Sequence, residues 1–306
     1  MIEFDRVAKN YDGRPIVADL SFTVAQGEFC ALVGSSGSGK STTLRMINRL
    51  IERDGGTIRL DGQDIATLPL EQLRRRIGYV IQSAGLFPHW TIRNNIATVP
   101  RLLGWPEDRV SKRVDELLAL VRLDPATGAK YPHQLSGGQQ QRVGVARALA
   151  ADPSVLLMDE PFGALDPITR DALRVELRAI HQATGKTILM VTHDIDEAVQ
   201  LADKIAILAD GKLVQFGTPA EILGHPANDF VRDFIGGTGI GLKLLSLQRV
   251  GDHLRPGLTA TGASIAASAP LTEALSEMIL RHTDRLPVCD DKGGIAGAVA
   301  LADLVT

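Results

Sequence analysis

A glycine-rich stretch near the start of the chain, residues 34–41, most constrains what this sequence can fold into. Its letters, GSSGSGKS, match the phosphate-binding pattern G-x-x-x-x-G-K-S/T. The mostly apolar residues 28–33 before it predict a buried strand, and residues 42–50 after it predict a helix. An ordinary glycine-rich turn is the alternative, and it is disfavoured because every fixed position of the pattern is present in the right context. We therefore predict a nucleotide phosphate site at a strand-to-helix turn.

The residue types in this stretch suit the binding of an anion. Glycines let the backbone turn tightly, so that its N–H groups point at a phosphate, and the following helix directs its positive end at the same group. Lys40 supplies a cation for the β- and γ-phosphates, and Ser41 offers a hydroxyl to Mg²⁺, which prefers oxygen ligands. The predicted nucleotide-binding residues of this segment are Gly34, Ser35, Ser36, Gly37, Ser38, Gly39, Lys40, Ser41 and Thr42.

Two adjacent acids end a second apolar stretch, residues 155–160, with the letters VLLMDE. A buried parallel strand would bring Asp159 to the carboxyl edge of the sheet, beside the phosphate loop, where it can hold Mg²⁺. Glu160 comes next and is the candidate that polarises the attacking water. A lone Asp-Glu pair more often lies in a solvated loop, but beside a phosphate loop the catalytic interpretation is favoured.

The pattern along the chain predicts an α/β domain with a largely parallel sheet, since short apolar runs alternate with helical periodicity. A third buried strand is predicted at residues 187–191, and a helix that begins after Asp166 and stops at Gly185. The 33 basic and 36 acidic residues nearly balance, which argues against a non-specific nucleic-acid binder. The chain has two cysteines, no apolar run near ~18–20 residues and no signal-peptide core. We therefore expect the protein to be cytoplasmic.

A third motif, residues 135–139 with the letters LSGGQ, is the most specific. Here the chain resembles the ATP-binding subunits of ABC transporters. In that family the serine and glycines form an anion cradle at a helix start and bind the γ-phosphate of ATP held by the opposite subunit. The resemblance implies ATP and Mg²⁺ as cofactors and a dimer with ATP at its interface. It adds to the predicted nucleotide-binding residues Ser136, Gly137, Gly138 and Gln139.

Other positions match motifs of the same family. Tyr11 resembles the aromatic residue that stacks on adenine, with a plain surface tyrosine as the alternative. Gln82, in residues 80–83, resembles the glutamine that touches Mg²⁺ or water and senses the membrane partner. Asp166 resembles an acid of the family's D-loop, and it can also be only a helix cap. His193 resembles the histidine that contacts the γ-phosphate.

The resemblance also implies roles and a fold. The expected catalytic residues are Lys40, Gln82, Glu160 and His193, and the expected metal ligands are Ser41, Gln82 and Asp159. The expected fold is a P-loop NTPase of the ABC type, an α/β core like that of RecA with an antiparallel β edge. A helical subdomain is expected at about residues 88–152.

The lack of a membrane-spanning apolar run also suggests that the channel is on a separate chain. Bacterial importers of this family usually place the ATPase and the channel on separate chains, so we expect integral membrane permease subunits as partners. An extracytoplasmic solute-binding protein is an indirect partner, and the expected location is the cytoplasmic face of the inner membrane. Phe87 and Trp90 are candidate anchors for the permease, with internal packing as an equal alternative.

The substrate class is suggested by two stretches. Residues 87–105 and residues 46–52 resemble the glycine betaine, choline and carnitine importer branch. The chain would then be an ATPase, converting ATP and water to ADP and phosphate, that drives osmoprotectant quaternary-amine uptake. An importer ATPase for an amino acid or a metal is the alternative. A non-transport ABC ATPase is less favoured, because one cassette is present and no heptads separate the phosphate loop from residues 135–139.

The last part of the chain has a separate pattern. Glycines at residues 236–239 predict a linker, and residues 271–304, including the acidic-glycine turn at 290–294, resemble one CBS (cystathionine-β-synthase-type) motif. The predicted organisation is an ATP-binding domain at 1–236, a linker at 237–245 and a single CBS-like α+β module at 246–306. Such modules are implicated in sensing ionic strength in this branch, and a small packing module is the alternative.

Overall fold

The computed structural model describes residues 1–82, 85–290 and 293–304. Ser83 of the predicted glutamine motif, Asp291 and Lys292 of the acidic-glycine turn, and the last two residues lie outside the described residues. The chain divides into two compact units, Met1–Pro219 and Ala220–Thr306. The sequence predicted a domain boundary after residue 236, whereas the two compact units meet between residues 219 and 220.

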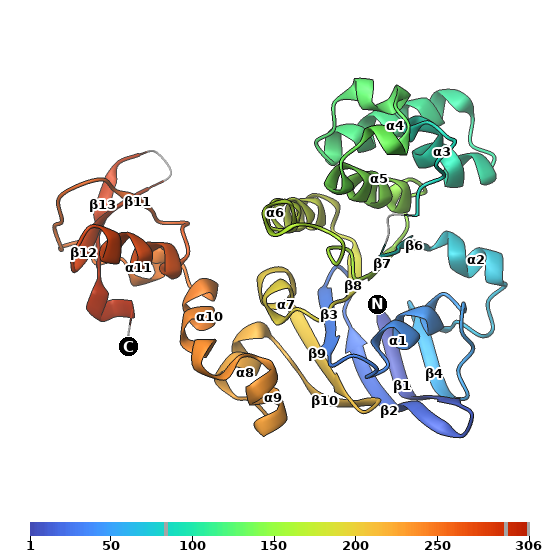
Figure 1. Ribbon diagram of the computed structural model, residues 1–306, viewed down its shortest axis with the longest axis horizontal. Helices are drawn as coiled ribbons and strands as arrows, with labels where there is room; N and C mark the ends of the chain where they lie inside the picture. Colours follow the sequence, from blue (N-terminus) through green and yellow to red (C-terminus); the bar gives the residue numbers. More distant parts are fainter. Residues whose placement is uncertain (83–84, 291–292, 305–306) are drawn as a thin grey trace. The chain divides into compact units, whose positions relative to one another are not determined.

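A six-stranded sheet forms the centre of the first unit (Figure 1). Its order is β10-β9-β3-β8-β7-β6, and only β10 runs antiparallel to its neighbour. The bounds are β3 Phe29–Gly34, β6 Ile77–Val80, β7 Val155–Asp159, β8 Thr187–Val191, β9 Lys204–Ala209 and β10 Lys212–Gly217. Every residue of β3, β7 and β8 is buried, as expected for parallel strands covered on both faces. The three strands predicted from apolar runs are thereby confirmed.

A second, antiparallel sheet of four strands has the order β2-β1-β4-β5. Its bounds are β1 Ile2–Tyr11, β2 Arg14–Val24, β4 Gly55–Leu60 and β5 Gln63–Asp64. The helix α1 (Lys40–Ile47) follows β3, and Leu44, Met46 and Ile47 belong to the same hydrophobic cluster as side chains of both sheets. This shared core fixes α1, and with it the loop before α1, between the two sheets.

A helical region lies above the sheets in the view of Figure 1. It contains α3 (Ile92–Leu102), α4 (Glu107–Leu120) and α5 (Gly137–Leu149), with the short 3-10 helices η1 (Pro125–Ala129) and η2 (Pro132–Gln134). All three helices contact one another. These elements lie within the stretch 88–152 that was predicted to be helical, whereas α2 (Leu70–Arg75) precedes β6.

Two helices after β7 complete the first unit. The helix α6 (Pro167–Thr184) begins after Asp166, whose side chain accepts the N–H of Thr169, and ends at Gly185 in the left-handed conformation. Both predicted ends of this helix are confirmed. The helix α7 (Ile195–Leu201) follows β8 and contacts α6. No helix in the described part of the chain is both long and apolar enough to cross a bilayer.

The second unit has its own core. A three-stranded sheet, order β11-β12-β13, is built from β11 (Ile265–Ala266), β12 (Arg285–Cys289) and β13 (Ile295–Ala300). Its helices are α8 (Pro219–Gly224), α9 (Asp229–Phe234), α10 (Ile240–Leu247) and α11 (Leu271–Leu280), with η3 (Gly237–Gly239), η4 (Val250–His253) and η5 (Leu301–Leu304). Residues 237–245, predicted as a linker, are thus helical, because the apolar α10 packs against α11 and α9 contacts η3.

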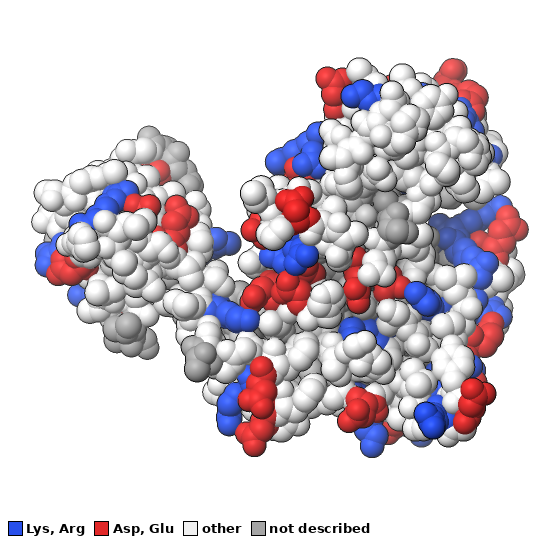
Figure 2. All heavy atoms as spheres, viewed as in Figure 1, with Lys and Arg blue, Asp and Glu red and all other residues white. Residues whose placement is uncertain are grey.

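Charged side chains of both signs are interspersed over the visible face of each unit (Figure 2). Many form close ion pairs, such as Arg53 with Asp64 at 3.1 Å and Arg101 with Glu107 at 2.7 Å. Opposite charges are therefore often neighbours on the surface.

Candidate nucleotide site

The loop at residues 34–41 joins β3 to α1, as the sequence predicted. Gly39 precedes the first residue of α1 and has φ 92°, a left-handed conformation that other residues rarely adopt. A Cβ atom at Gly39 would lie 2.5 Å from the carbonyl oxygen of Ile16. The turn therefore needs glycine at this position, and it starts α1 with its positive end at the loop.

Lys40 is folded back over this loop. Its Nζ donates to the carbonyl oxygens of Gly34 at 2.9 Å and Ser35 at 2.7 Å, and it lies 3.4 Å from Ser38 Oγ. Burial lowers the pKa of Lys40, while the nearby carboxylates of Glu160 and Asp159 act in the opposite direction. The ammonium group is thus held where a phosphate bound by the loop would meet it.

Ser41 and Asp159 meet at one side of the loop. Ser41 Oγ donates to Asp159 Oδ1 at 2.8 Å, and Asp159 is 5% exposed at the end of β7. The other carboxylate oxygen, Oδ2, lies 3.2 Å from Nη2 of Arg45 and 3.4 Å from the hydroxyl of Tyr79. A hydrogen bond to Tyr79 is the main cause that raises the pKa of Arg45, and burial raises the pKa of Tyr79.

This arrangement suits a hard cation that also contacts phosphate. Hydroxyl and carboxylate oxygens are ligands that Mg²⁺ prefers, and Mg²⁺ is commonly held by one or two such groups together with substrate phosphates. Among the described residues no three His, Cys, Asp or Glu side chains form a metal-binding group by themselves. A magnesium ion here would therefore be held by Ser41 and Asp159 with the help of the nucleotide.

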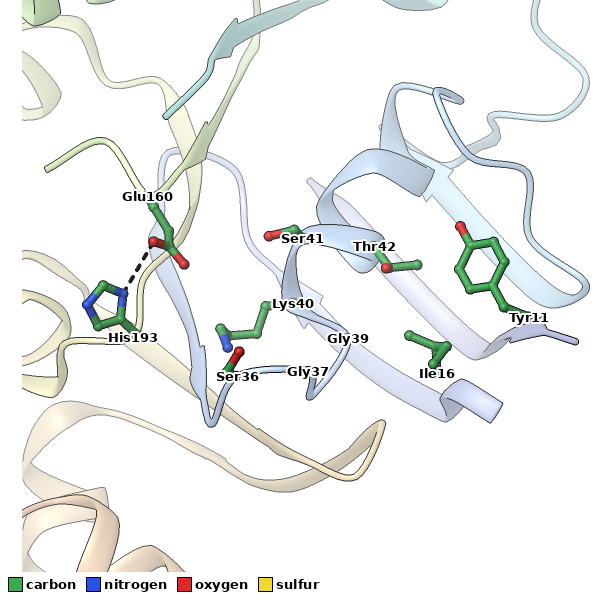
Figure 3. A pocket seen from close by; sticks show the side chains of 10 residues that line it. All are labelled: Tyr11, Ile16, Ser36, Gly37, Gly39, Lys40, Ser41, Thr42, Glu160 and His193. Atoms are coloured by element: carbon green, nitrogen blue, oxygen red, sulfur yellow. Dashed lines mark ion pairs between the residues drawn. The ribbon is translucent and has the colours of Figure 1, made fainter. Parts of the chain in front are cut away.

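Glu160 lies next to two other predicted site residues. Its Oε2 is 3.3 Å from Nδ1 of His193 and 3.4 Å from Nε2 of Gln82. Figure 3 shows Glu160 and His193 facing each other on the side of the loop opposite Tyr11. Glu160 has φ 45°, and its N–H donates to the carbonyl of Val191 in β8. The structure thus brings together the three side chains that were predicted to handle the attacking water and the γ-phosphate.

A cleft of about 610 Å³ connects these groups. Its described lining consists of Tyr11, Ile16, Ser36, Gly37, Gly39, Lys40, Ser41, Thr42, Glu160 and His193. Tyr11 lies at one end with 45% of its surface exposed, as needed for a flat ring that receives a base (Figure 3). The polar groups lie at the other end, so the cleft offers an aromatic face and an anion site within one cavity.

Comparisons with known proteins agree with this geometry. A family model described as "ABC transporter" matches residues 17–163. The "Glycine betaine uptake system ATP-binding protein YehX" of Escherichia coli (strain K12) is 53% identical over 305 residues, which are 100% of this chain and 99% of that protein. This chain belongs to the family of ABC transporter ATP-binding proteins.

Two further proteins are similar to this ABC ATPase. The "Glycine betaine/carnitine/choline transport ATP-binding protein OpuCA" of Bacillus subtilis (strain 168) is 48% identical over 98% of this chain and 78% of that protein. The structure titled "Dimeric structure of a post-hydrolysis state of the ATP-binding cassette MJ0796 bound to ADP and Pi" aligns with a TM-score of 0.64 and 32% identity. It covers 72% of this chain and 99% of that chain.

The LSGGQ motif of this ABC ATPase lies away from the cleft. Ser136 caps α5: its Oγ accepts the N–H of Gln139, whose side chain accepts the N–H of Ser136. Ser136, Gly137 and Gln139 are exposed, and none of residues 136–139 is in the described lining of the cleft. Within one chain, the motif and the phosphate loop are therefore not brought together, which leaves the motif open to a second molecule.

Three residues of the site were not found from the sequence. Arg45 and Tyr79 contact Asp159, and Ile16 lines the cleft beside Tyr11. Arg45 follows Ser41 by four positions, so the two share one face of α1, and this spacing was a usable signal. Tyr79 reaches Asp159 because β6 pairs with β7, an order of strands that no local pattern indicates.

Proposed function

We propose that this chain is the ATP-hydrolysing subunit of an importer for osmoprotectant quaternary amines, the class of glycine betaine, choline and carnitine. The observation that carries the proposal is the convergence of Lys40, Ser41, Glu160 and His193 on one cleft, with Asp159 hydrogen-bonded to Ser41. The support for the substrate class is that relatives described as glycine betaine or carnitine transport ATP-binding proteins align over almost all of this chain.

The proposed chemistry is phosphoryl transfer to water. Lys40 and the backbone N–H groups of the loop stabilise charge on the γ-phosphate, and Glu160 orients water in line for attack. His193 holds the phosphate from the side of Glu160, and Gln82, already in contact with Glu160, senses the water. Mg²⁺ held by Ser41 and Asp159 would neutralise phosphate charge, with Gln82 as a further proposed ligand.

The proposed active form is a dimer of ATPase subunits. Ser136, Gly137, Gly138 and Gln139 of each subunit would close the cleft of the other, so that ATP lies at the interface. The dimer is supported by two observations: Ser136 is exposed, and it does not line the cleft of its own chain. Hydrolysis would release this contact and let the two subunits separate.

The proposed membrane partners are permease subunits on separate chains, with an extracytoplasmic binding protein as an indirect partner. Phe87 and Trp90 are 40% and 38% exposed, and their rings lie 4.7 Å apart. The buried Asn95 holds this segment by accepting the N–H of Phe87 and donating to the carbonyls of Phe87 and Trp90. A rigid pair of exposed aromatic rings is a suitable anchor for a partner helix at the cytoplasmic face of the membrane.

The second unit is proposed to contain a single CBS-like module. Support comes from its order of elements, β11, α11, β12 and β13, around a hydrophobic cluster of its own that includes Leu271, Met278 and Val288. Its proposed role is to sense ionic strength.

The test is an ATPase measurement on the assembled transporter. The chain would be produced with its permease and binding-protein partners and reconstituted in vesicles. We expect glycine betaine to stimulate ATP hydrolysis, and more strongly as salt rises. Stimulation by an amino acid or a metal ion but not by glycine betaine would overturn the substrate class. A response that does not change with salt would overturn the sensing role alone.

A further inference from the structure

A buried arginine contacts the segment that carries His193, yet the chemistry proposed above gives it no role. Arg174 on α6 is 7% exposed. Its Nη2 lies 3.1 Å from Oδ2 of Asp194 and 3.2 Å from Oε1 of Glu197, and its Nη1 lies 3.0 Å from Asp171. A buried charge is costly unless it is paired. These carboxylates are therefore expected to hold the guanidinium group of Arg174 in one position.

Glu197 also forms hydrogen bonds with Thr192 and Asp194, the two residues on either side of His193. Its Oε2 accepts a 2.5 Å hydrogen bond from Oγ1 of Thr192, and the same Oγ1 accepts the N–H of Asp194 at 3.0 Å. Asp194 in turn caps α7, where its Oδ1 accepts the N–H of Glu197 at 3.2 Å. The backbone on each side of His193 is therefore tied to the buried pair of Arg174 and Glu197.

His193 itself is poorly constrained by its own side-chain contacts. Its side chain is 62% exposed, and the ion pair that the structure gives it is the one with Glu160 at 3.3 Å. The direction of the imidazole ring therefore depends on where the backbone of residues 192–194 places it. A displacement of about 1 Å at a reacting group can cost on the order of 100-fold in rate.

We propose that Arg174 and Glu197 are positioning residues for His193. The buried pair fixes the backbone of residues 192–194, so that the imidazole faces Glu160 and the phosphate end of the cleft. The inference rests on the proposed ATP hydrolysis and adds to it two residues that do not touch the nucleotide. It also links α6, which begins after Asp166, to the segment that carries His193.

The test compares Arg174→Met and Glu197→Gln with Arg178→Met in the complete protein. Arg178 lies one turn further along α6, where it pairs with Asp203 at 3.3 Å and donates to the carbonyl oxygen of Leu201 at the end of α7. A cation stays near the two carboxylates in Arg174→Met, since Arg170 lies 3.8 Å from Asp194 and 3.9 Å from Glu197. We expect the single-turnover rate to fall on the order of 100-fold in the two test variants, with ATP affinity within about twofold. Arg178→Met should keep the wild-type rate.

A second comparison separates positioning from a merely structural role. In a His193→Ala background, adding Arg174→Met or Glu197→Gln should change the remaining rate by less than about threefold, because residues that act through one group are not additive. An equal further loss in that background would overturn the inference. Glu197→Gln keeps the size of the side chain and decides the test alone where Arg174→Met does not fold.

The outcomes also separate this inference from the function on which it rests. Absence of ATP hydrolysis by the wild-type protein with its partners would overturn both. Hydrolysis that needs His193 but stays at the wild-type rate in Arg174→Met and Glu197→Gln would overturn the positioning role and leave the proposed function standing.

Discussion

Ser41 and Asp159 are 118 positions apart in the sequence and are joined by a hydrogen bond of 2.8 Å between Oγ and Oδ1. The bond connects the first turn of α1 to the end of β7, so it brings a hydroxyl and a carboxylate to one side of the phosphate loop. Both are oxygen donors of the kind that Mg²⁺ prefers. This contact therefore marks the proposed metal end of the cleft.

Replacing Ser41 should change the magnesium requirement. In Ser41→Ala the hydroxyl is lost, and we expect the Mg²⁺ concentration for half-maximal ATPase activity to rise about tenfold or more. Titration of ATPase activity with MgCl₂ measures this. Ser111→Ala, an exposed serine on α4, is the matched control and should leave the titration unchanged. The same Mg²⁺ dependence in Ser41→Ala and wild type would contradict the assignment of Ser41.

Two glycines of the phosphate loop should differ in their tolerance of alanine. Gly37 has φ 80° with nothing within 4 Å of an added Cβ, so Gly37→Ala should lower the free energy of unfolding by only ~1–2 kcal/mol. Gly39 has φ 92° and would in addition bring its Cβ to 2.5 Å from the carbonyl of Ile16. Gly39→Ala should therefore cost about 2 kcal/mol more, as overpacking does. Urea unfolding without nucleotide measures both, and equal costs would contradict the close approach.

Asp152 should contribute a pH-dependent stability. Its hydrogen bond with Lys186, at 2.7 Å, is the main cause that lowers the pKa of Asp152 below its usual 3.8. The charged form is therefore favoured in the folded protein. Its contribution is present above pH 3.8 and is lost as the pH falls through the lowered pKa of the folded state.

Asp152→Asn measures that contribution. Because the carboxylate is 65% exposed, we expect a loss of at most ~1 kcal/mol at pH 7. Urea unfolding at a series of pH values should show the difference from wild type shrinking below pH 3.8. Asp108→Asn, an exposed acid on α4, controls for the change of net charge. A difference that grows as the pH falls would contradict the lowered pKa.

Much of the site could be predicted because its chemistry is carried by short motifs. The phosphate loop, the acids Asp159 and Glu160 and the cap of α6 at Asp166 depend on neighbours along the chain, so local patterns indicate them. Arg45, Tyr79 and Arg174 gain their partners only when α1 and β6 lie beside β7 and α6 packs against α7. No periodicity of a single segment contains that information.

In the second unit, local composition predicted less regular structure than the fold contains. The glycines at residues 236–239 predict an open linker, since glycine favours turns. The structure has η3 and α10 over residues 237–245 of the predicted linker, because α10 contacts α11 and its Leu245 packs against the hydrophobic cluster of the second unit. The composition predicted a linker without regular structure. The structure has helices there, because this segment packs against a helix that is distant in the sequence.

Glu160 is proposed to orient the attacking water in the ATPase cycle that drives osmoprotectant uptake. The most direct measurement is ATP-dependent uptake of labelled glycine betaine into vesicles that contain the reconstituted transporter, with wild type and Glu160→Gln compared. We predict uptake with wild type, a rate lower by on the order of 10³-fold with Glu160→Gln, and ATP bound equally well by both. Glu71→Gln, an exposed acid on α2, should transport like wild type. Uptake by Glu160→Gln at the wild-type rate, or no uptake by wild type, would contradict the claim.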